Sequence, residues 1–177
     1  MLHLITGGSR SGKSRYAEQL AARHDGPVCY VATAEVRDEE FAERVREHRR
    51  HRPAHWRWVE AERALAAELL RHDQEDGLLL VDCLGMWLIR FFDDKDELDA
   101  AGFAEERALL LEAVASLQGQ LLIVTNEIGW GAMPVSAMAR RYGDLLGKLN
   151  QDLAAQCDHV TLMACGLPLA LKQTAHS

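Results

Sequence analysis

The feature that most constrains the fold of this chain is a glycine-rich stretch near its N-terminus. It reads Gly7-Gly8-Ser9-Arg10-Ser11-Gly12-Lys13-Ser14, which matches glycine, any four residues, then Gly-Lys-Ser. An apolar run, Leu2–Thr6, precedes it and a helix-like segment, Lys13–Arg23, follows it, as a phosphate-binding P-loop requires. We predict that the loop binds a nucleotide, with Lys13 on the β- and γ-phosphates and Ser14 on Mg²⁺. A chance glycine-rich turn is the alternative.

The physical basis of that prediction is the backbone of the loop. Glycines turn tightly and bring backbone N–H groups close to phosphate oxygens. The N-terminus of the following helix adds partial positive charge.

The rest of the chain alternates short apolar runs with helical stretches, which predicts an α/β fold. The apolar runs are nearly continuous in hydrophobicity, as in parallel strands that are buried on both faces. We predict one domain over residues 1–177, of the P-loop NTPase type, with a mostly parallel central sheet flanked by helices in the recombinase-like manner. The predicted strands are Leu2–Thr6, Val28–Ala32, Leu78–Asp82, Leu121–Thr125 and Val160–Cys165. The predicted helices are Lys13–Arg23, Glu39–Arg50, Ala61–His72, Ala104–Leu117 and Val135–Gln156.

Composition excludes several classes of function. The net charge of −7 argues against a general nucleic-acid binder, because phosphate contacts need a basic surface. No apolar stretch reaches the roughly 18 residues of a membrane span, and the N-terminus leaves no room for a signal peptide. The four cysteines show no C-x-x-C spacing and are typical of thiols in a reducing compartment. We therefore expect a cytoplasmic protein.

Ligands of open α/β sheets bind beyond the carboxyl ends of the strands, so the residues after each predicted strand are candidate site residues. Asp82 ends one such run and suits the acidic element that holds Mg²⁺ in P-loop enzymes; helix capping is the alternative. Ala32-Thr33-Ala34 and Asn126-Glu127 follow two other strands. The segment from Asn126 to Pro134 contains Trp130 between two glycines, and could close over a substrate.

A basic segment, residues 44–57, stands out in this acidic chain. It holds six arginines and three histidines, and His48 and His51 share a helical face with Arg44. Histidine is a known nucleophile in covalent catalysis, and flanking arginines would keep it neutral and stabilise charge on a phosphoryl group. A solvated basic helix that ends before Pro53 is the alternative.

Taken together, these motifs resemble the bifunctional adenosylcobinamide kinase / adenosylcobinamide-phosphate guanylyltransferase family of cobalamin biosynthesis. The resemblance covers almost the whole chain, and its most specific part is Thr125-Asn126-Glu127-Ile128-Gly129. The other matching residues are Thr6 to Arg15, Tyr30-Val31-Ala32-Thr33, His48-Arg49, Arg52-Pro53, Trp56, Val81-Asp82-Cys83-Leu84, Gly131, Pro134, Asn150-Gln151, Gly166 and Leu171-Lys172.

The resemblance implies two reactions. The first phosphorylates the aminopropanol hydroxyl of adenosylcobinamide with GTP or ATP, and the second transfers GMP from GTP to adenosylcobinamide phosphate. By motif position His48 would carry GMP covalently, with His51 and His55 as neighbouring alternatives. The implied GTP site adds Arg49, Arg50, His51, Arg52, Ala32, Thr33, Ala34, Glu60 and Asp82. Glu60 is a candidate for guanine because a carboxylate accepts hydrogen bonds from its N–H groups. A homotrimer is also implied.

Some positions depart from the family pattern, such as Leu88-Ile89-Arg90, where an asparagine is common, and Ser9, where alanine is common. Two other functions compete with the implied one. One is a P-loop kinase for another small molecule, with the histidine and arginine cluster binding phosphate only. The other is a non-enzymatic, nucleotide-dependent interaction module.

Overall fold

The computed structural model describes residues 1–34 and 53–174. Its centre is a seven-stranded sheet in the order β3-β2-β4-β5-β1-β6-β7. The neighbours from β3 to β6 pair in parallel, and β7 alone runs antiparallel to β6. The strands are β1 (Leu2–Gly7), β2 (Val28–Ala32), β3 (Arg57–Glu60), β4 (Leu78–Asp82), β5 (Gln120–Val124), β6 (His159–Ala164) and β7 (Leu167–Gln173).

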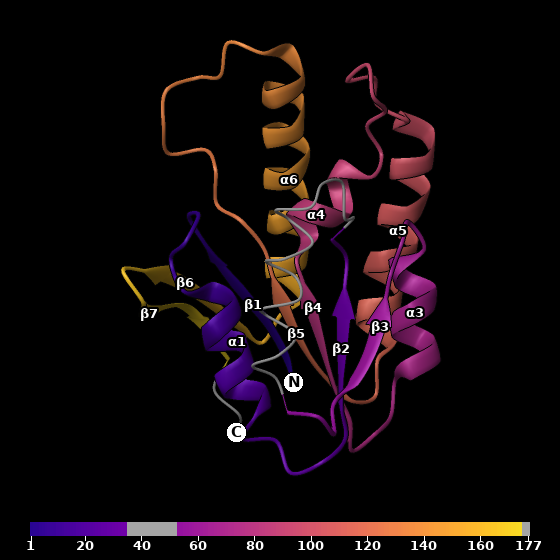
Figure 1. The fold of residues 1–177 in the computed structure, drawn as a ribbon. Coiled ribbons are helices and arrows are strands. Elements are labelled where there is room, and N and C mark those ends of the chain that lie inside the picture. The colour runs from indigo at the N-terminus through magenta and orange to yellow at the C-terminus, as the bar shows by residue number, and fades with distance from the viewer. Residues whose placement is uncertain (35–52, 175–177) are drawn as a thin grey trace.

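Helices cover both faces of the sheet (Figure 1). Helix α1 packs against β1, β4 and β5 on one face, whereas α3, α5, α6 and the short α4 lie over the other. Their bounds are α1 Lys13–Ala21, α3 Leu65–His72, α4 Leu84–Ile89, α5 Ala100–Ser116 and α6 Ala137–Gln156. Neighbouring strand residues such as Leu4 and Ile5 belong to different core clusters, because successive side chains of a strand point to opposite faces. The sheet is therefore buried on both sides, and the predicted P-loop-type α/β fold is confirmed.

All five predicted strands are present, with ends that differ by at most one residue. The sequence prediction missed β3 and β7, which are the two edge strands. Each lacks the continuous apolar run of a buried strand. Strand β3 has only two apolar residues, which lie between two charged ones, and β7 contains Pro168 and leaves its leucines exposed. Edge positions tolerate both patterns because one side of the strand faces solvent.

The helix ends follow local capping chemistry. Helix α5 begins at Ala100 rather than at Ala104, because the Asp99 side chain accepts a hydrogen bond from the N–H of Gly102. Ser136 caps α6 in the same way. At the other end of α6, Lys172 Nζ donates to the carbonyls of Ala154 and Ala155, at 2.9 and 3.0 Å.

Three other predicted helices have different ends: α1 ends at Ala21 rather than at Arg23, α6 begins at Ala137 rather than at Val135, and α3 differs at its start. Helix α3 begins at Leu65 rather than at Ala61, and Ala61 is instead bonded to β2 through its N–H. The prediction contained no helix at α4. The predicted helix Glu39–Arg50 lies outside the described residues.

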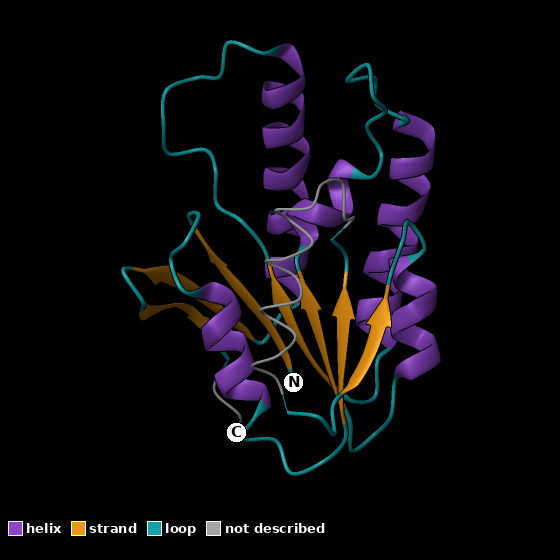
Figure 2. Cartoon of the chain, in the orientation of Figure 1, coloured by secondary structure: helices purple, strands orange, loops and turns teal. Residues whose placement is uncertain are grey.

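The carboxyl ends of the parallel strands lie together along one side of the sheet, which we call the P-loop edge. The P-loop, the start of α4 and the loop between β5 and α6 all lie there (Figure 2). This edge carries the candidate site residues that the structure describes. Across residues 1–34 and 53–174, no helix is both long and apolar enough to span a bilayer.

Candidate active site

The loop from Gly7 to Ser14 has a backbone that only glycine fits at two positions. Gly7 has φ of +148°, and a side chain there would collide with the Met163 carbonyl. Gly12 has φ of +96°, and a Cβ atom would lie 3.3 Å from Gly166 Cα. Because α1 begins directly after Gly12, the free N–H groups of its first turn face the loop. The geometry is that of an anion cradle at a helix N-terminus.

Lys13 is the cation of this loop. Its side chain is buried, with 8% exposed, and Nζ donates to the carbonyl of Gly8 at 2.6 Å. Burial lowers the pKa of the Lys13 amine, while the negative charge of Asp82 acts in the opposite direction. The hydrogen bond to Gly8 therefore holds the ammonium against the loop, where it could neutralise phosphate charge.

The turn between β6 and β7 forms a wall of the P-loop. The N–H of Gly166 donates to the carbonyl of Ser11 at 3.0 Å, and Gly166 itself has φ of +78°. The Ser11 hydroxyl is buried and has no hydrogen-bond partner among the described residues. Sequence reasoning assigned no role to this turn, because it is the pairing of β6 with β1, with Met163 opposite Gly7, that brings it to the loop.

Asp82 lies at the end of β4, two strands from β1, with β5 between them. Its Oδ2 atom accepts a hydrogen bond from the Tyr30 hydroxyl at 2.8 Å. The Tyr30 ring in turn stacks on Trp58 of β3, with 4.9 Å between the ring centroids. The sequence prediction used Tyr30 only as a motif residue, and the structure makes it the orienting partner of the predicted metal ligand.

A hydrogen bond connects the residues that follow β2 and β4. The Thr33 side chain is fully buried and donates its hydroxyl hydrogen to the Cys83 carbonyl at 2.7 Å. The Thr33 carbonyl accepts from Arg90 Nε at 2.8 Å. Ala32 is buried beside it, and Ala34 is partly exposed. The predicted nucleotide contacts of residues 32–34 stay predictions. In the described structure, Thr33 connects the end of β2 to Cys83 and Arg90 by hydrogen bonds.

The end of β5 is fixed to α6 by one side chain. The Asn150 carbonyl oxygen accepts from the Thr125 hydroxyl at 2.7 Å, and its amide donates to the Asn126 carbonyl at 3.0 Å. Tyr142 also reaches this region, since a side chain at Gly85 would meet both the Tyr142 hydroxyl and the Asn126 amide. The two motifs that contain Thr125 and Asn150 thus form one rigid unit.

Glu60 does not lie beside the P-loop. It ends β3, which is four strands from β1 in the sheet, or about 19 Å at the usual strand spacing. Its nearest described neighbour across the sheet is Ala32 of β2. His48, Arg49, Arg50, His51 and Arg52 lie outside the described residues. His55 is exposed just before β3.

Magnesium would need few protein ligands at this edge. The Ser14 hydroxyl at the start of α1 and the Asp82 carboxylate supply hard oxygen donors, and one Asp82 oxygen is already oriented by Tyr30. Within the described residues, no cluster of three or more His, Cys, Asp or Glu side chains could hold a metal alone. The donor set therefore fits Mg²⁺, which is typically shared with substrate phosphates and water, where it would supply positive charge to those phosphates.

The loop between β5 and α6 extends well beyond the sheet (Figure 1). Several of its apolar side chains are exposed, among them Trp130 at 76% and Val135 at 97%. Trp130 lies on a loop after a strand, as the sequence predicted, whereas closure of this loop over a substrate stays a prediction.

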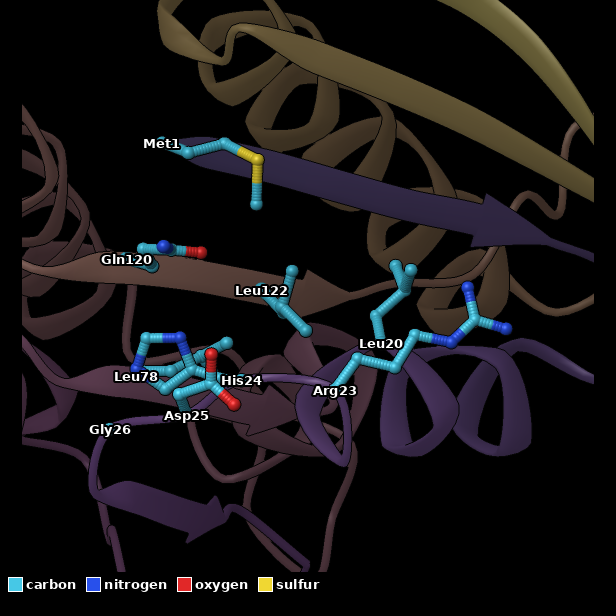
Figure 3. A pocket seen from close by; sticks show the side chains of 9 residues that line it. All are labelled: Met1, Leu20, Arg23, His24, Asp25, Gly26, Leu78, Gln120 and Leu122. Carbon is cyan, nitrogen blue, oxygen red and sulfur yellow. The ribbon is translucent and has the colours of Figure 1, made fainter.

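A hollow of about 420 Å³ lies at the opposite edge of the sheet (Figure 3). The C-terminal end of α1 and the amino ends of β4 and β5 line it, with Leu20, Leu78 and Leu122 among its side chains. The length of β1, about 20 Å, separates this edge from the P-loop. The hollow is therefore not part of the candidate active site.

A P-loop between a parallel strand and a helix, with an acidic residue ending a nearby strand, defines a nucleotide-binding protein of the P-loop NTPase type. Solved structures agree on the fold. The flagellar accessory protein FlaH from Methanocaldococcus jannaschii matches with a TM-score of 0.52 and 11% identity, over 98% of this chain and 78% of that one. A type III secretion ATPase of pathogenic bacteria matches with a TM-score of 0.55 and 14% identity, over 96% of this chain and 56% of that one.

The chain belongs to the cobinamide kinase / cobinamide phosphate guanyltransferase family, whose model matches residues 3–171. The bifunctional adenosylcobalamin biosynthesis protein CobP of Pseudomonas aeruginosa is 46% identical over 97% of this chain and 98% of its own length. The proteins named CobU from Salmonella typhimurium and Escherichia coli are 35% and 37% identical, over 97% of this chain and their full length. The family resemblance read from the sequence motifs is confirmed.

Proposed function

We propose that this protein is a bifunctional enzyme of cobalamin biosynthesis. It phosphorylates the hydroxyl of adenosylcobinamide with GTP or ATP, and then transfers GMP from GTP to adenosylcobinamide phosphate. The observation that carries the proposal is the P-loop with its buried Lys13, in a chain that matches the family over residues 3–171. Relatives of 35–46% identity and nearly equal length carry bifunctional names, which supports both activities.

The kinase step uses the P-loop edge of the sheet. Phosphoryl transfer needs positioning and neutralisation of charge more than covalent chemistry by the protein. The loop N–H groups and Lys13 would hold the triphosphate, and Ser14 and Asp82 would hold Mg²⁺. Tyr30 supports Asp82 in that role because it orients the carboxylate from 2.8 Å.

The guanylyl transfer would proceed through a histidine nucleophile. His48 is the proposed carrier of GMP because its motif position matches, and because arginines flank it in the basic segment. The imidazole nitrogen attacks the α-phosphorus of GTP and pyrophosphate leaves. The phosphate of adenosylcobinamide phosphate then attacks the same phosphorus and releases His48.

The test is incubation with GTP labelled in the α-phosphate, followed by denaturing electrophoresis and peptide mapping. The wild-type protein should carry an acid-labile label, and His48→Ala should lose the label and the guanylyl transfer but keep the kinase. His51→Ala and His55→Ala are the matched controls and should keep the label. Label that persists in His48→Ala but disappears in His51→Ala would move the nucleophile to His51. A wild-type protein that takes no label would favour a P-loop kinase whose basic cluster only binds phosphate.

The proposal extends to assembly and location. A homotrimer is supported by the family resemblance and by exposed apolar side chains such as Leu167 and Val135, which an assembly would cover. Sedimentation equilibrium of the purified chain tests this state, and a monomer at micromolar concentration would contradict it. A cytoplasmic location is supported by the four free cysteines.

A further inference from the structure

Glu127 occupies a position between the two parts of the kinase site. It follows β5, the strand that separates β1, which leads into the P-loop, from β4, which ends in Asp82. The β5 pairing with β1 continues past the strand end, since the N–H of Thr125 donates to Ile5 and the N–H of Glu127 donates to the Gly7 carbonyl at 3.0 Å. The backbone of Glu127 is therefore bonded to the first residue of the P-loop.

The carboxylate of Glu127 is not used by the fold. Its side chain is partly exposed, and the described structure gives it one long contact, 3.5 Å from Oε1 to the N–H of Gly129. Within residues 1–34 and 53–174 no lysine, arginine or histidine forms an ion pair with it. The backbone N–H of Glu127 is held by the Gly7 carbonyl, and the carbonyl of the preceding Asn126 is held by Asn150, whereas the acidic group is left available to a ligand.

The other acidic groups near this edge have different positions or partners. Asp82 is oriented by Tyr30 and lies on the far side of β5 from the P-loop. Glu60 lies four strands from β1. Of these three carboxylates, only that of Glu127 follows the strand directly beside β1, and its one hydrogen bond among the described residues is the long contact with Gly129. It also begins the loop whose exposed apolar side chains, including Trp130, suit a large apolar substrate.

The two proposed reactions differ in their need for a base. The kinase acceptor is an alcohol, which holds its proton at neutral pH and must lose it as the new bond to phosphorus forms. The guanylyl acceptor is a phosphate that is already deprotonated. A general base at the P-loop edge would therefore serve only the first reaction.

We infer that Glu127 is the catalytic base of the kinase reaction and receives the proton of the substrate alcohol. This rests on the proposed function, because it assumes an alcohol acceptor at the P-loop. The hydroxyl proton passes to the Glu127 carboxylate, and the freed oxygen pair forms a bond to the γ-phosphorus. The bond from that phosphorus to the β–γ bridging oxygen breaks, and its electron pair leaves with the nucleoside diphosphate, beside Lys13.

The test compares Glu127→Gln and Glu127→Asp with wild type in two separate assays. One assay measures phosphorylation of cobinamide, and the other measures guanylyl transfer to cobinamide phosphate supplied directly. Glutamine keeps the size of the side chain and the main-chain bond to Gly7 but cannot accept the proton. We expect its kinase kcat to fall by about 10²–10³, with the KM for nucleotide and the guanylyl transfer rate changed by less than about twofold. Glu127→Asp keeps a carboxylate and should retain an intermediate kinase rate.

Glu112→Gln is the matched control, because Glu112 is exposed on α5 away from this edge. It should leave both rates unchanged. Kinase kcat in Glu127→Gln within about threefold of wild type, too little for a lost general base, would overturn the inference. So would an equal loss of both reactions, since that would assign Glu127 a structural role. A wild-type protein that transfers no phosphoryl group to cobinamide would instead refute the proposed kinase function, and with it the need for this base.

Discussion

Tyr30 donates its hydroxyl hydrogen to Oδ2 of Asp82 at 2.8 Å, although 52 positions separate the two residues in the chain. The bond is possible because β2 and β4 are neighbours in the sheet, and Tyr30 in the middle of β2 is paired with Leu80, two residues before Asp82 at the end of β4. Groups that orient a metal ligand are often as important to metal affinity as the ligand itself. This bond therefore leads to the first prediction.

Tyr30→Phe should raise the Mg²⁺ concentration needed for half-maximal kinase activity by about tenfold, because the Asp82 carboxylate loses its orienting partner. Asp82→Asn should raise it further, since it removes the negative charge as well. Titration of kinase activity with Mg²⁺ at fixed nucleotide gives both values. If neither variant changed the Mg²⁺ concentration for half-maximal activity, Asp82 would have only a structural role at the end of its strand.

Lys13→Ala should slow the kinase by about 10²–10³, which is the usual cost of losing one positioned charge in a transition state. We expect guanylyl transfer to fall as well, because both reactions need the triphosphate. Lys148→Ala is the control, since Lys148 is an exposed lysine of α6 that pairs with Asp152. Near-normal kinase turnover in Lys13→Ala would show that the P-loop assignment is wrong.

Glu60→Gln should weaken the preference for GTP over ATP in guanylyl transfer, because an amide donates as well as accepts hydrogen bonds. The measurement is turnover with each nucleotide in each assay, with Glu62→Gln as the neighbouring control. An unaltered ratio in guanylyl transfer would mean that guanine is recognised elsewhere.

His3 should make the fold sensitive to mild acid. Burial, and then the nearby His159, lower the pKa of His3 to about 4, and its Nε2 lies 2.8 Å from the Thr161 hydroxyl oxygen. An unfolded chain binds a proton at His3 below about pH 6.5, whereas the folded chain does not until about pH 4. Stability is therefore lost as the pH falls, by about 2 kcal/mol between pH 7 and pH 5 from this residue.

Urea unfolding of wild type and His3→Asn at these two pH values tests this sensitivity. The asparagine variant keeps a hydrogen-bonding side chain but does not titrate. Its free energy of unfolding should decrease by about 2 kcal/mol less than that of wild type over the same pH range. Equal decreases in the two proteins would contradict the prediction.

The sequence by itself determines those features of this protein that depend on neighbouring residues in the chain. The P-loop pattern, the five buried strands and the position of Asp82 at a strand end each depend on residues that are close together in the chain. Buried parallel strands are continuous apolar runs because both of their faces are covered. The glycines at positions 7 and 12 are likewise required by the backbone of the loop itself.

Only the tertiary structure decided which of those strand ends meet. The sheet order places β5 between β1 and β4, so that Glu127 comes to the P-loop, while Glu60 on β3 is carried about 19 Å away. The bonds from Tyr30 to Asp82 and from Gly166 to Ser11 join residues far apart in the chain. Such contacts leave no periodic pattern in the sequence, because each depends on the pairing of whole strands rather than on its neighbours.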